Sequence, residues 1–257
     1  MSYTIAVAGK GGTGKTTLTG LLIDYLVKKG EEPILAVDAD ANSNLNEVLG
    51  EDVDITIGEI REEVSKRENT GNSFPGGMTK AQYLKYRLNT SVIEGRGYDL
   101  IVMGRSEGQG CYCYVNGMLR EQIDSLSDSY KYLVIDNEAG MEHLSRKTTK
   151  SIDTLFLVSD SSRRGIQAVG RINQLVKDLN LTVRNIYLIV NRVPNNVLKK
   201  ETLEEIKKQG LELLGTVPMD AQIYEYDAEG VPLVNLPEDS LSKQALKEIL
   251  SKIQFGK

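Results

Sequence analysis

The 257-residue chain is expected to form one α/β domain whose mostly parallel central sheet is covered by helices on both faces. Short continuous apolar runs recur along the chain, helical patterns separate them, and polar residues gather where the runs end. Continuous apolar strands, rather than alternating ones, are typical of parallel sheets that are buried on both sides. The polar residues would then meet at the carboxyl edge of the sheet, where such sheets bind their ligands.

Six apolar runs predict the buried strands, which are residues 3–8, 33–37, 98–103, 132–135, 154–158 and 186–190. Helical patterns cover residues 15–29, 167–179, 200–209 and the amphipathic segment 240–255. Residues 54–97 interrupt this alternation because they are polar, with two expected helices at 57–67 and 79–88 around the loop NTGNSFPGG. We interpret them as an insertion within a single domain of residues 1–257, serving as a partner surface or as a solvated excursion.

Composition narrows the class of partner and the compartment. The formal net charge of −5 disfavours nucleic acid and anionic membrane surfaces as partners, and no apolar run has the roughly 18 residues that would span a bilayer. The N-terminal residues lead straight into an apolar strand, so no targeting segment is expected and the cytoplasm is the predicted location. Two cysteines in such a chain are expected to remain reduced thiols, available for metal or redox chemistry.

A phosphate-binding loop is the strongest motif. The segment AGKGGTGKTTL at residues 8–18 contains G-x-x-x-x-G-K-T between an expected strand and an expected helix, which is the context the motif requires. Glycines let successive backbone N–H groups point at phosphate oxygens, and the helix start adds its positive dipole. Lys15 would reach the β- and γ-phosphates, and the Thr16 hydroxyl would ligate Mg²⁺. The expected nucleotide-binding residues are Gly11, Gly12, Thr13, Gly14, Lys15, Thr16 and Thr17.

A second lysine in this loop indicates a family. Lys10 follows Gly9 directly, and the string KGGTGKTT resembles the deviant Walker A loop of the MinD/ParA/nitrogenase-iron-protein group of dimerising ATPases. The resemblance implies a P-loop domain that forms a homodimer and uses ATP/ADP with Mg²⁺. It also implies that Lys10 crosses the dimer interface and contacts the nucleotide of the other subunit. Such a cation would act like an arginine finger on the transferring phosphoryl group.

Acidic strand ends match the same group. The segment AVDADANSNL resembles the D-x-D switch I of the family, which implies that Asp38 lies near Mg²⁺ and that Asp40 positions the attacking water. The segment YLVIDNEAGMEH implies Asp136 as the Walker B carboxylate and Gly140 as the switch II glycine. Glu138 stands where the family more often has proline. An aspartate at a strand end is elsewhere often only a turn former or a helix cap.

The expected base is adenine. GTPases recognise guanine through N-K-x-D, whereas the corresponding strand here ends in IVNRVPNN, with Asn191 and Arg192 but no aspartate at the fourth position. An asparagine amide is able to bond an adenine edge instead. The later segment TVPMD resembles the second base-side loop of the family and adds Pro218 and Asp220 to the expected site.

Both cysteines lie in the segment GQGCYCYVNG. Residues i and i+2 project to one side of an extended segment, and Asn116-Gly117 suggests a loop that enters a helix at Met118. A disulfide across one residue would be strained, so free thiols are expected. A closed thiolate site needs about four ligands, and a two-fold dimer would supply Cys111 and Cys113 from each subunit. The alternative is a pair of small apolar residues in a loop core.

The C-x-C pair on this P-loop domain resembles the CooC-type nickel-insertion ATPases of carbon monoxide dehydrogenase maturation. The resemblance implies ATP-dependent delivery of Ni²⁺ to that enzyme as client, although Zn²⁺ satisfies the same thiolates. An Fe–S cluster carrier of the nitrogenase-iron-protein type is one alternative, and C-x-C spacing counts against it. A MinD- or ParA-like partitioning ATPase is another, which the acidic charge balance disfavours. An amidotransferase relative is a third alternative, which is weakened because no Cys–His pair is seen.

Overall fold

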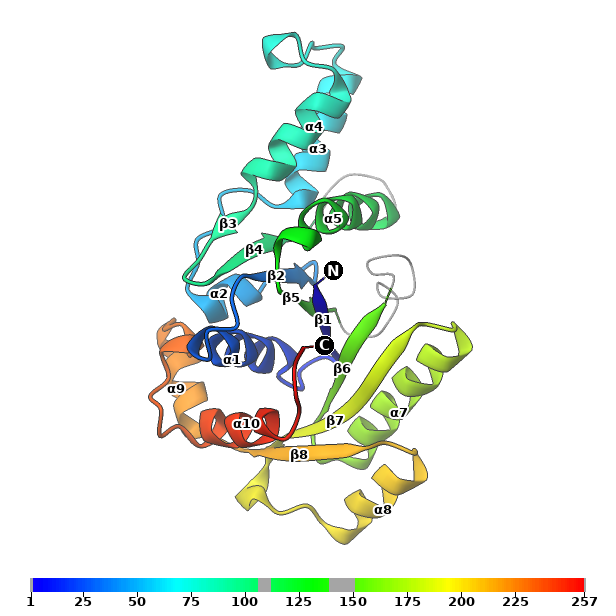
Figure 1. Cartoon of the computed structure of the whole chain (residues 1–257), viewed down its shortest axis with the longest axis vertical. Coiled ribbons are helices and arrows are strands. Elements are labelled where there is room, and N and C mark those ends of the chain that lie inside the picture. The colour runs from blue at the N-terminus through cyan, green and yellow to red at the C-terminus, as the bar shows by residue number, and fades with distance from the viewer. Residues whose placement is uncertain (1, 106–111, 139–150, 257) are drawn as a thin grey trace.

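The computed structural model describes residues 2–105, 112–138 and 151–256. At its centre lies one eight-stranded sheet in the order β3-β4-β2-β5-β1-β6-β7-β8 (Figure 1). Neighbouring strands pair in parallel except for β3, which is antiparallel to β4. The predicted α/β class is therefore confirmed. The strands are β1 Tyr3–Gly9, β2 Ile34–Ala39, β3 Ile93–Glu94, β4 Tyr98–Val102, β5 Tyr132–Asn137, β6 Ile152–Ser159, β7 Val183–Val193 and β8 Leu213–Pro218.

The helices of the described residues cover both faces of this sheet (Figure 1). None of them is long and apolar enough to cross a membrane. They are α1 Lys15–Lys28, α2 Leu45–Leu49, α3 Ile57–Asn69, α4 Lys80–Thr90, α5 Tyr112–Leu126, α7 Arg163–Asp178, α8 Lys200–Lys208, α9 Ala221–Glu229 and α10 Leu241–Ser251. Short 3₁₀ turns span Pro75–Gly77, Ser127–Ser129, Pro194–Asn196 and Leu233–Asn235.

Successive strand residues enter different hydrophobic clusters. In β1, Ile5 and Val7 pack with side chains of α1 and α10, whereas Ala6 and Ala8 pack with side chains of α7. Successive side chains of a strand point to opposite faces, so a strand must be apolar throughout when both faces are covered. This geometry explains why the strands appear in the sequence as continuous apolar runs.

The strand order brings three loops to one edge of the sheet. Strand β1 lies between β5 and β6, and β5 also pairs with β2. The register places Asp136 of β5 beside Val7 of β1 on one side and beside Asp38 of β2 on the other. All four strands run in parallel, so the segments that follow β1, β2 and β5 emerge together at the carboxyl edge.

The segment 54–97 forms a helical hairpin that projects from the domain (Figure 1). Both helices begin with capping boxes, in which Thr56 pairs with Glu59 and Thr79 with Gln82. Glu63 of α3 ties the two helices together, since it accepts hydrogen bonds from the Tyr83 hydroxyl and, at 3.0 Å, from Arg87 Nε on α4. A second ion pair, 2.7 Å between Lys80 Nζ of α4 and Glu68 of α3, also joins the helices. The hairpin is therefore held by local caps and by ion pairs between its two helices.

Strands β3 and β8 and the start of helix α7 differ from the sequence expectation. Strand β8 was not among the six expected strands because its residues are mostly half-buried and include Gly215. A Cβ at Gly215 would lie 2.5 Å from Ile249 Cγ1 of α10, so the glycine allows close packing of helix on strand. Helix α7 begins at Arg163, four residues before the expected start, because the Ser162 side chain caps it by accepting a bond from Gly165 N–H.

The expected helix start at Met118 is wrong. Helix α5 begins at Tyr112 and continues through Asn116-Gly117, so Cys113 lies in its first turn. A glycine inside a helix costs only about 1 kcal/mol relative to alanine, which the packing of Met118 and Ile123 in the core cluster of α3 and α5 outweighs. Asn-Gly therefore does not interrupt the helix here. The backbone at Cys113 is helical, not extended as expected.

Candidate nucleotide-binding site

The loop between β1 and α1 has the backbone form that a phosphate cradle needs. Gly12 has φ of 77° and Gly14 has φ of 84°, the left-handed region in which glycine is strongly favoured. Gly14 is also the N-cap of α1, so the helix dipole points its positive end into the loop. A Cβ at Gly9 would lie 2.2 Å from the Val158 carbonyl oxygen, so β1 and β6 approach too closely there for any side chain.

The two lysines of this loop lie in contrasting environments. Lys15 is only 7 % exposed and starts α1, whereas Lys10 is exposed. Within the described residues, neither ammonium has a hydrogen-bond or ion-pair partner. The Thr13 hydroxyl donates a bond of 2.8 Å to the Lys10 carbonyl oxygen, which fixes the loop backbone while the Lys10 side chain remains in solvent. The charge of Lys15 acts on the buried Asp136, but the ammonium makes no direct bond in the described residues, so a further anion beside it would be favourable.

The two aspartates after β2 take different positions. Asp38 is fully buried and accepts bonds from the backbone N–H groups of Asp40 at 3.0 Å and Leu45 at 2.9 Å. Asp40 is half-buried, and its Oδ1 accepts bonds from the backbone and side chain of Asn42 at 2.8 and 3.0 Å. Asp38 thus organises the turn into α2, while the carboxylate of Asp40 stays within reach of solvent.

Asp136 closes the inner end of the site. It is 1 % exposed, and its Oδ1 accepts a bond of 3.2 Å from the Thr19 hydroxyl of α1, while Oδ2 has no hydrogen-bond partner among the residues that the structure describes. Burial, followed by the nearby Asp38 charge, raises the pKa of Asp136 to about 7. Burial likewise raises the pKa of Asp38 to about 6. Two carboxylates that resist ionisation side by side mark a place for a cation.

These groups fit a magnesium nucleotide. Asp136 Oδ2, which has no hydrogen-bond partner among the described residues, and the Thr16 hydroxyl are oxygen donors of the kind that Mg²⁺ prefers. Lys15, whose charge acts on Asp136, is a cation suited to phosphate. The left-handed Gly12 and Gly14 leave the loop without side chains at these two positions, which is the form expected of a phosphate cradle. The chemistry of the donor set thus agrees with the expected residues of the loop.

The family model that describes the CobQ/CobB/MinD/ParA nucleotide binding domain matches residues 4–233. The chain belongs to this family. The match begins in β1 and ends at the 3₁₀ turn Leu233–Asn235, so it covers every strand of the sheet and the complete site. A nucleotide-binding role of the loop is accordingly a property of the family and agrees with the geometry above.

Individual relatives cover nearly the same length. An uncharacterized ATP-binding protein of Methanocaldococcus jannaschii is 46% identical over 250 residues, which are 97% of each chain. The carbon monoxide dehydrogenase accessory protein CooC of Rhodospirillum rubrum is 29% identical over 248 residues, 90% of this chain and 89% of CooC. Among solved structures, MinD of Pyrococcus horikoshii complexed with Mg-ADP aligns with a TM-score of 0.71, 24% identity and coverage of 98% and 96%. The last likeness concerns the fold.

A cavity of about 760 Å³ lies beside the loop, lined by residues expected on the base side of the site. Thr17, Asn191, Arg192, Pro218 and Asp220 all line it, so the structure brings the expected base-side residues together. The Asn191 amide is already engaged, since Nδ2 donates to the Thr13 carbonyl at 2.9 Å and Oδ1 accepts from Arg192 N–H at 2.9 Å. These bonds make Asn191 a brace behind the loop, while its amide keeps one further N–H and one further lone pair.

Arg192 and Asp220 also hold the walls of the cavity. Arg192 Nη1 donates to the Gly12 carbonyl at 3.1 Å. Asp220 caps α9 and accepts bonds from the Ser240 hydroxyl at 2.7 Å and Ser242 N–H at 3.0 Å. Although burial opposes the change, these bonds lower the pKa of Asp220. Asp220 therefore fastens α9 to α10 at the cavity floor.

Sequence reasoning missed two groups. Thr19 lies one turn after Lys15 on α1, and its hydroxyl also donates to the Lys15 carbonyl at 2.9 Å. Its position one helical turn after Lys15, on the same face of α1, is the sequence signal that would have predicted it. Tyr224 on α9 lines the 760 Å³ cavity and is 76 % exposed, and Met219 beside it is also exposed. Both are large apolar groups at the rim of the cavity, which suits stacking on a base.

Some expected site residues fall outside the described residues. Cys111 and Gly140 are among them, as is His143, and of Cys113 only the backbone in α5 is described. No group of three or more histidine, cysteine or acidic side chains suited to a metal ion occurs in the described parts of the chain.

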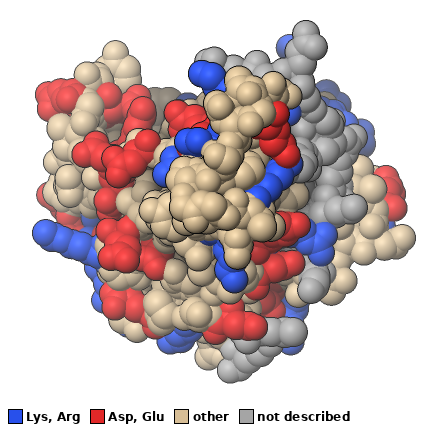
Figure 2. Space-filling model, turned by 90° about the horizontal axis from the view of Figure 1, so that it is seen from above, with Lys and Arg blue, Asp and Glu red and all other residues tan. Residues whose placement is uncertain are grey.

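Surface charge on the face seen from above is mixed (Figure 2). Acidic side chains gather along one flank, while lysines and arginines are scattered singly among other residues. The view shows no continuous basic stripe of the kind that tracks a phosphate backbone.

A second cavity of about 910 Å³ adjoins Thr16 and Thr17 and carries Glu47, Glu51 and Asp52 on its wall.

Gly14→Ala is expected to weaken nucleotide binding by about tenfold or more, because the added methyl would lie 2.4 Å from Asn191 Nδ2 at a left-handed φ. The matched control is Gly71→Ala, also at positive φ but with open space around the new Cβ. Titration of a fluorescent ADP analogue measures both. Equal affinities of the two variants would show that the Gly14–Asn191 contact does not shape the site.

Proposed function

We propose that this protein is a dimerising ATPase that captures a metal ion, nickel, between two subunits and releases it to carbon monoxide dehydrogenase. The observation that carries the proposal is the pair Cys111-x-Cys113 on a P-loop domain with a second loop lysine at position 10. The likeness to CooC, named as an accessory protein of that enzyme, supports the choice of client. A cytoplasmic homodimer is part of the same proposal.

ATP hydrolysis would use the groups at the sheet edge. Lys15 and the loop amides bind the phosphates, and Thr16, Asp38 and Asp136 supply oxygens for Mg²⁺, which neutralises charge on the phosphates when bound. Asp40 is the carboxylate that remains accessible, so it is the candidate to orient the attacking water. Asp38 is buried, which raises its pKa, and two backbone N–H groups hold its carboxylate in place. It would therefore stay beside the bound Mg²⁺.

Dimerisation would complete the catalytic set. Lys10 is exposed and without a partner in the described residues, so its ammonium is free to meet a nucleotide on a facing subunit. A cation placed there stabilises charge that develops on the transferring phosphoryl group. The Lys10 side chain makes no hydrogen bond or ion pair with the part of its own subunit that the structure describes, which supports this proposed role.

Metal capture would depend on the same dimer. Cys113 lies in the first turn of α5, and a helix N-terminus lowers the pKa of a nearby thiol, which favours the thiolate that binds metal. One subunit supplies two thiols, and a two-fold axis through the pair would supply four. Nucleotide and metal would then favour the same dimer, so each would raise the affinity for the other.

The test is anaerobic equilibrium dialysis of Ni²⁺, with and without ATP, against the wild-type protein and the variants Cys111→Ala and Cys113→Ala. One nickel per dimer is expected in the wild type, with binding lost in both variants, because two thiolates do not close a tetrahedral site. Dimer mass is recorded in each sample, and His143→Ala serves as the control for the lone histidine. Nickel binding that persists in both cysteine variants would remove the cargo from the proposal and leave the ATPase. Competition with Zn²⁺ decides the preferred ion.

A further inference from the structure

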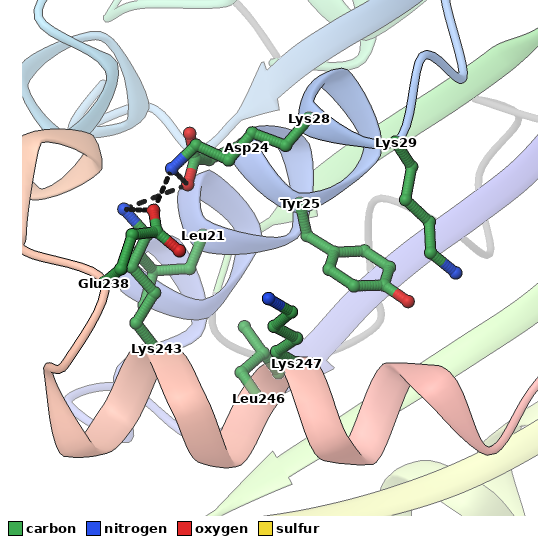
Figure 3. Close-up of a pocket in the computed structure, with 9 residues that line it drawn as sticks. All are labelled: Leu21, Asp24, Tyr25, Lys28, Lys29, Glu238, Lys243, Leu246 and Lys247. Atoms are coloured by element: carbon green, nitrogen blue, oxygen red, sulfur yellow. Dashed lines mark hydrogen bonds and ion pairs between the residues drawn. The ribbon is translucent and has the colours of Figure 1, made fainter.

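The middle of the phosphate loop has no secondary structure to set the direction of its peptide groups. Both ends of the loop are fixed, since β1 lies between β5 and β6 in the sheet and α1 is fastened to α10 (Figure 3). That fastening includes Lys243 Nζ of α10, which lies 3.1 Å from a carboxylate oxygen of Asp24 on α1. Residues 10–14 between these ends belong to neither a strand nor a helix. Other contacts must therefore set the direction of their N–H groups, on which a phosphate cradle depends.

Two side chains near the end of β7 bond to this part of the loop. Arg192 Nη1 donates to the Gly12 carbonyl oxygen at 3.1 Å, and Asn191 Nδ2 donates to the Thr13 carbonyl oxygen at 2.9 Å. Neighbouring residues of one strand thus hold two consecutive peptide groups. In a trans peptide, the C=O of one residue and the N–H of the next point in opposite directions. The N–H groups of Thr13 and Gly14 therefore point away from the two side chains that hold their peptides.

The backbone of Arg192 has an unusual conformation that accompanies this bond. Its φ is 54°, in the left-handed region that residues other than glycine adopt at a cost. The Arg192 N–H donates to Asn191 Oδ1 at 2.9 Å, which helps to fix the conformation. Strained residues of this kind persist where surrounding contacts determine them, and they gather at functional sites. Glycine would take this backbone with less strain, but it could not reach the loop.

The same two residues connect the loop with the expected base side of the site. Both line the cavity of about 760 Å³ beside the loop. They also lie close to the loop itself, because a Cβ at Gly14 would be 2.4 Å from Asn191 Nδ2 and 3.9 Å from Arg192 Nε. A nucleotide that enters the cavity would thus meet the residues that already hold the peptides on the phosphate side.

We propose that Arg192 and Asn191 are positioning residues, which aim the N–H groups of Thr13 and Gly14 at the phosphates of the nucleotide. N–H donors that are already oriented stabilise an anion more strongly, because they need no reorganisation when it arrives. Without the bond from Arg192, the peptide between Gly12 and Thr13 would be free to turn its N–H away. The inference rests on the nucleotide-binding part of the proposed function and is independent of nickel and of the dimer.

Calorimetric titration of the full chain with ADP and with pyrophosphate tests this role, because pyrophosphate has the phosphates but no base. Arg192→Met removes the guanidinium donors and keeps a long unbranched side chain, so both probes should bind about fivefold more weakly. Arg192→Lys retains a charged donor and should recover part of the lost affinity. The control is Arg171→Met on α7, an exposed arginine outside the cavity, which should bind both probes as the wild type does. Weaker binding of ADP alone, with pyrophosphate unchanged, would place the action of Arg192 at the base and overturn the proposal.

The amide proton shifts of Thr13 and Gly14 in NMR spectra separate positioning from a general structural effect. In the wild type, both protons should move downfield when pyrophosphate is added, as hydrogen bonds to its charged oxygens form. Arg192→Met should lose the shift of Thr13 and keep that of Gly14, whereas Asn191→Asp, which cannot donate to the Thr13 carbonyl, should do the reverse. Shifts that survive in both variants, even with a lower Tm, would leave the two residues a structural role only. A wild-type protein that binds neither probe would overturn the nucleotide site itself, and the proposal with it.

Discussion

Lys10→Ala is expected to hydrolyse ATP about 10³-fold more slowly than the wild type while binding ATP with little change, since a cation supplied across an interface is worth about that factor in kcat. The variant should fold normally. The Lys10 side chain is exposed and unpaired within the described residues, and only its backbone carbonyl is used, by Thr13. Phosphate release measured over a range of protein concentrations gives the rate, and the control is Lys200→Ala on the exposed face of α8.

A mixing experiment separates action across the interface from action within one subunit. Asp40→Asn should also be inactive, yet it retains Lys10. In a mixed dimer, the Lys10→Ala subunit has its own Asp40 and receives Lys10 from its partner. One of the two nucleotide sites of this dimer is therefore complete. Equal amounts of the two inactive variants should therefore recover about one quarter of the wild-type rate, from half of the dimers with half of their sites. If the mixture stays as inactive as its components, Lys10 does not act across a dimer.

Asp136→Asn should have opposite effects on stability and on activity. Without Mg²⁺ at pH 8, the variant is expected to be more stable by roughly 2 kcal/mol, or about 5 °C in Tm, because a buried charge with an unpartnered oxygen is removed. The Asn side chain keeps an oxygen for the Thr19 hydroxyl. ATP hydrolysis should fall by about 10²-fold or more, since a ligand for the metal is lost.

The pH dependence of stability follows from the raised pKa values of Asp136 and Asp38. The pKa of Asp136 is raised from 3.8 to about 7 in the folded protein and that of Asp38 to about 6. Between about pH 4 and pH 7 the folded state holds protons that the unfolded chain has released. The free energy of unfolding of the metal-free wild type should therefore decrease as the pH rises through this window.

Thermal unfolding in EDTA at pH 5 and pH 8 measures the effect. The Asp136→Asn variant should lose less stability over this range than the wild type, while Asp239→Asn, an exposed aspartate, should follow the wild type. Identical pH profiles for Asp136→Asn and the wild type would mean that Asp136 ionises at its ordinary pKa in the folded protein.

Local patterns were sufficient for much of the site. The motif from Gly9 to Thr16 lies between a strand and a helix, and two of its glycines, Gly12 and Gly14, take left-handed conformations. Asp38 and Asp136 were expected to meet because parallel strands deliver their carboxyl ends to one edge, and the register of β2 with β5 places them directly opposite each other. These inferences depend only on short-range sequence and on a general property of parallel sheets.

Other features depend on contacts between distant segments, which no local pattern contains. The sequence by itself determined the α/β class, the phosphate loop and the acidic strand ends, because backbone periodicity and turn chemistry act over a few residues. Only the tertiary structure decided that α5 starts at Tyr112 and that Asn191 is bonded behind the loop. In each case the outcome is set by which side chains meet in the packed core, and these meetings arise only when the whole chain has folded.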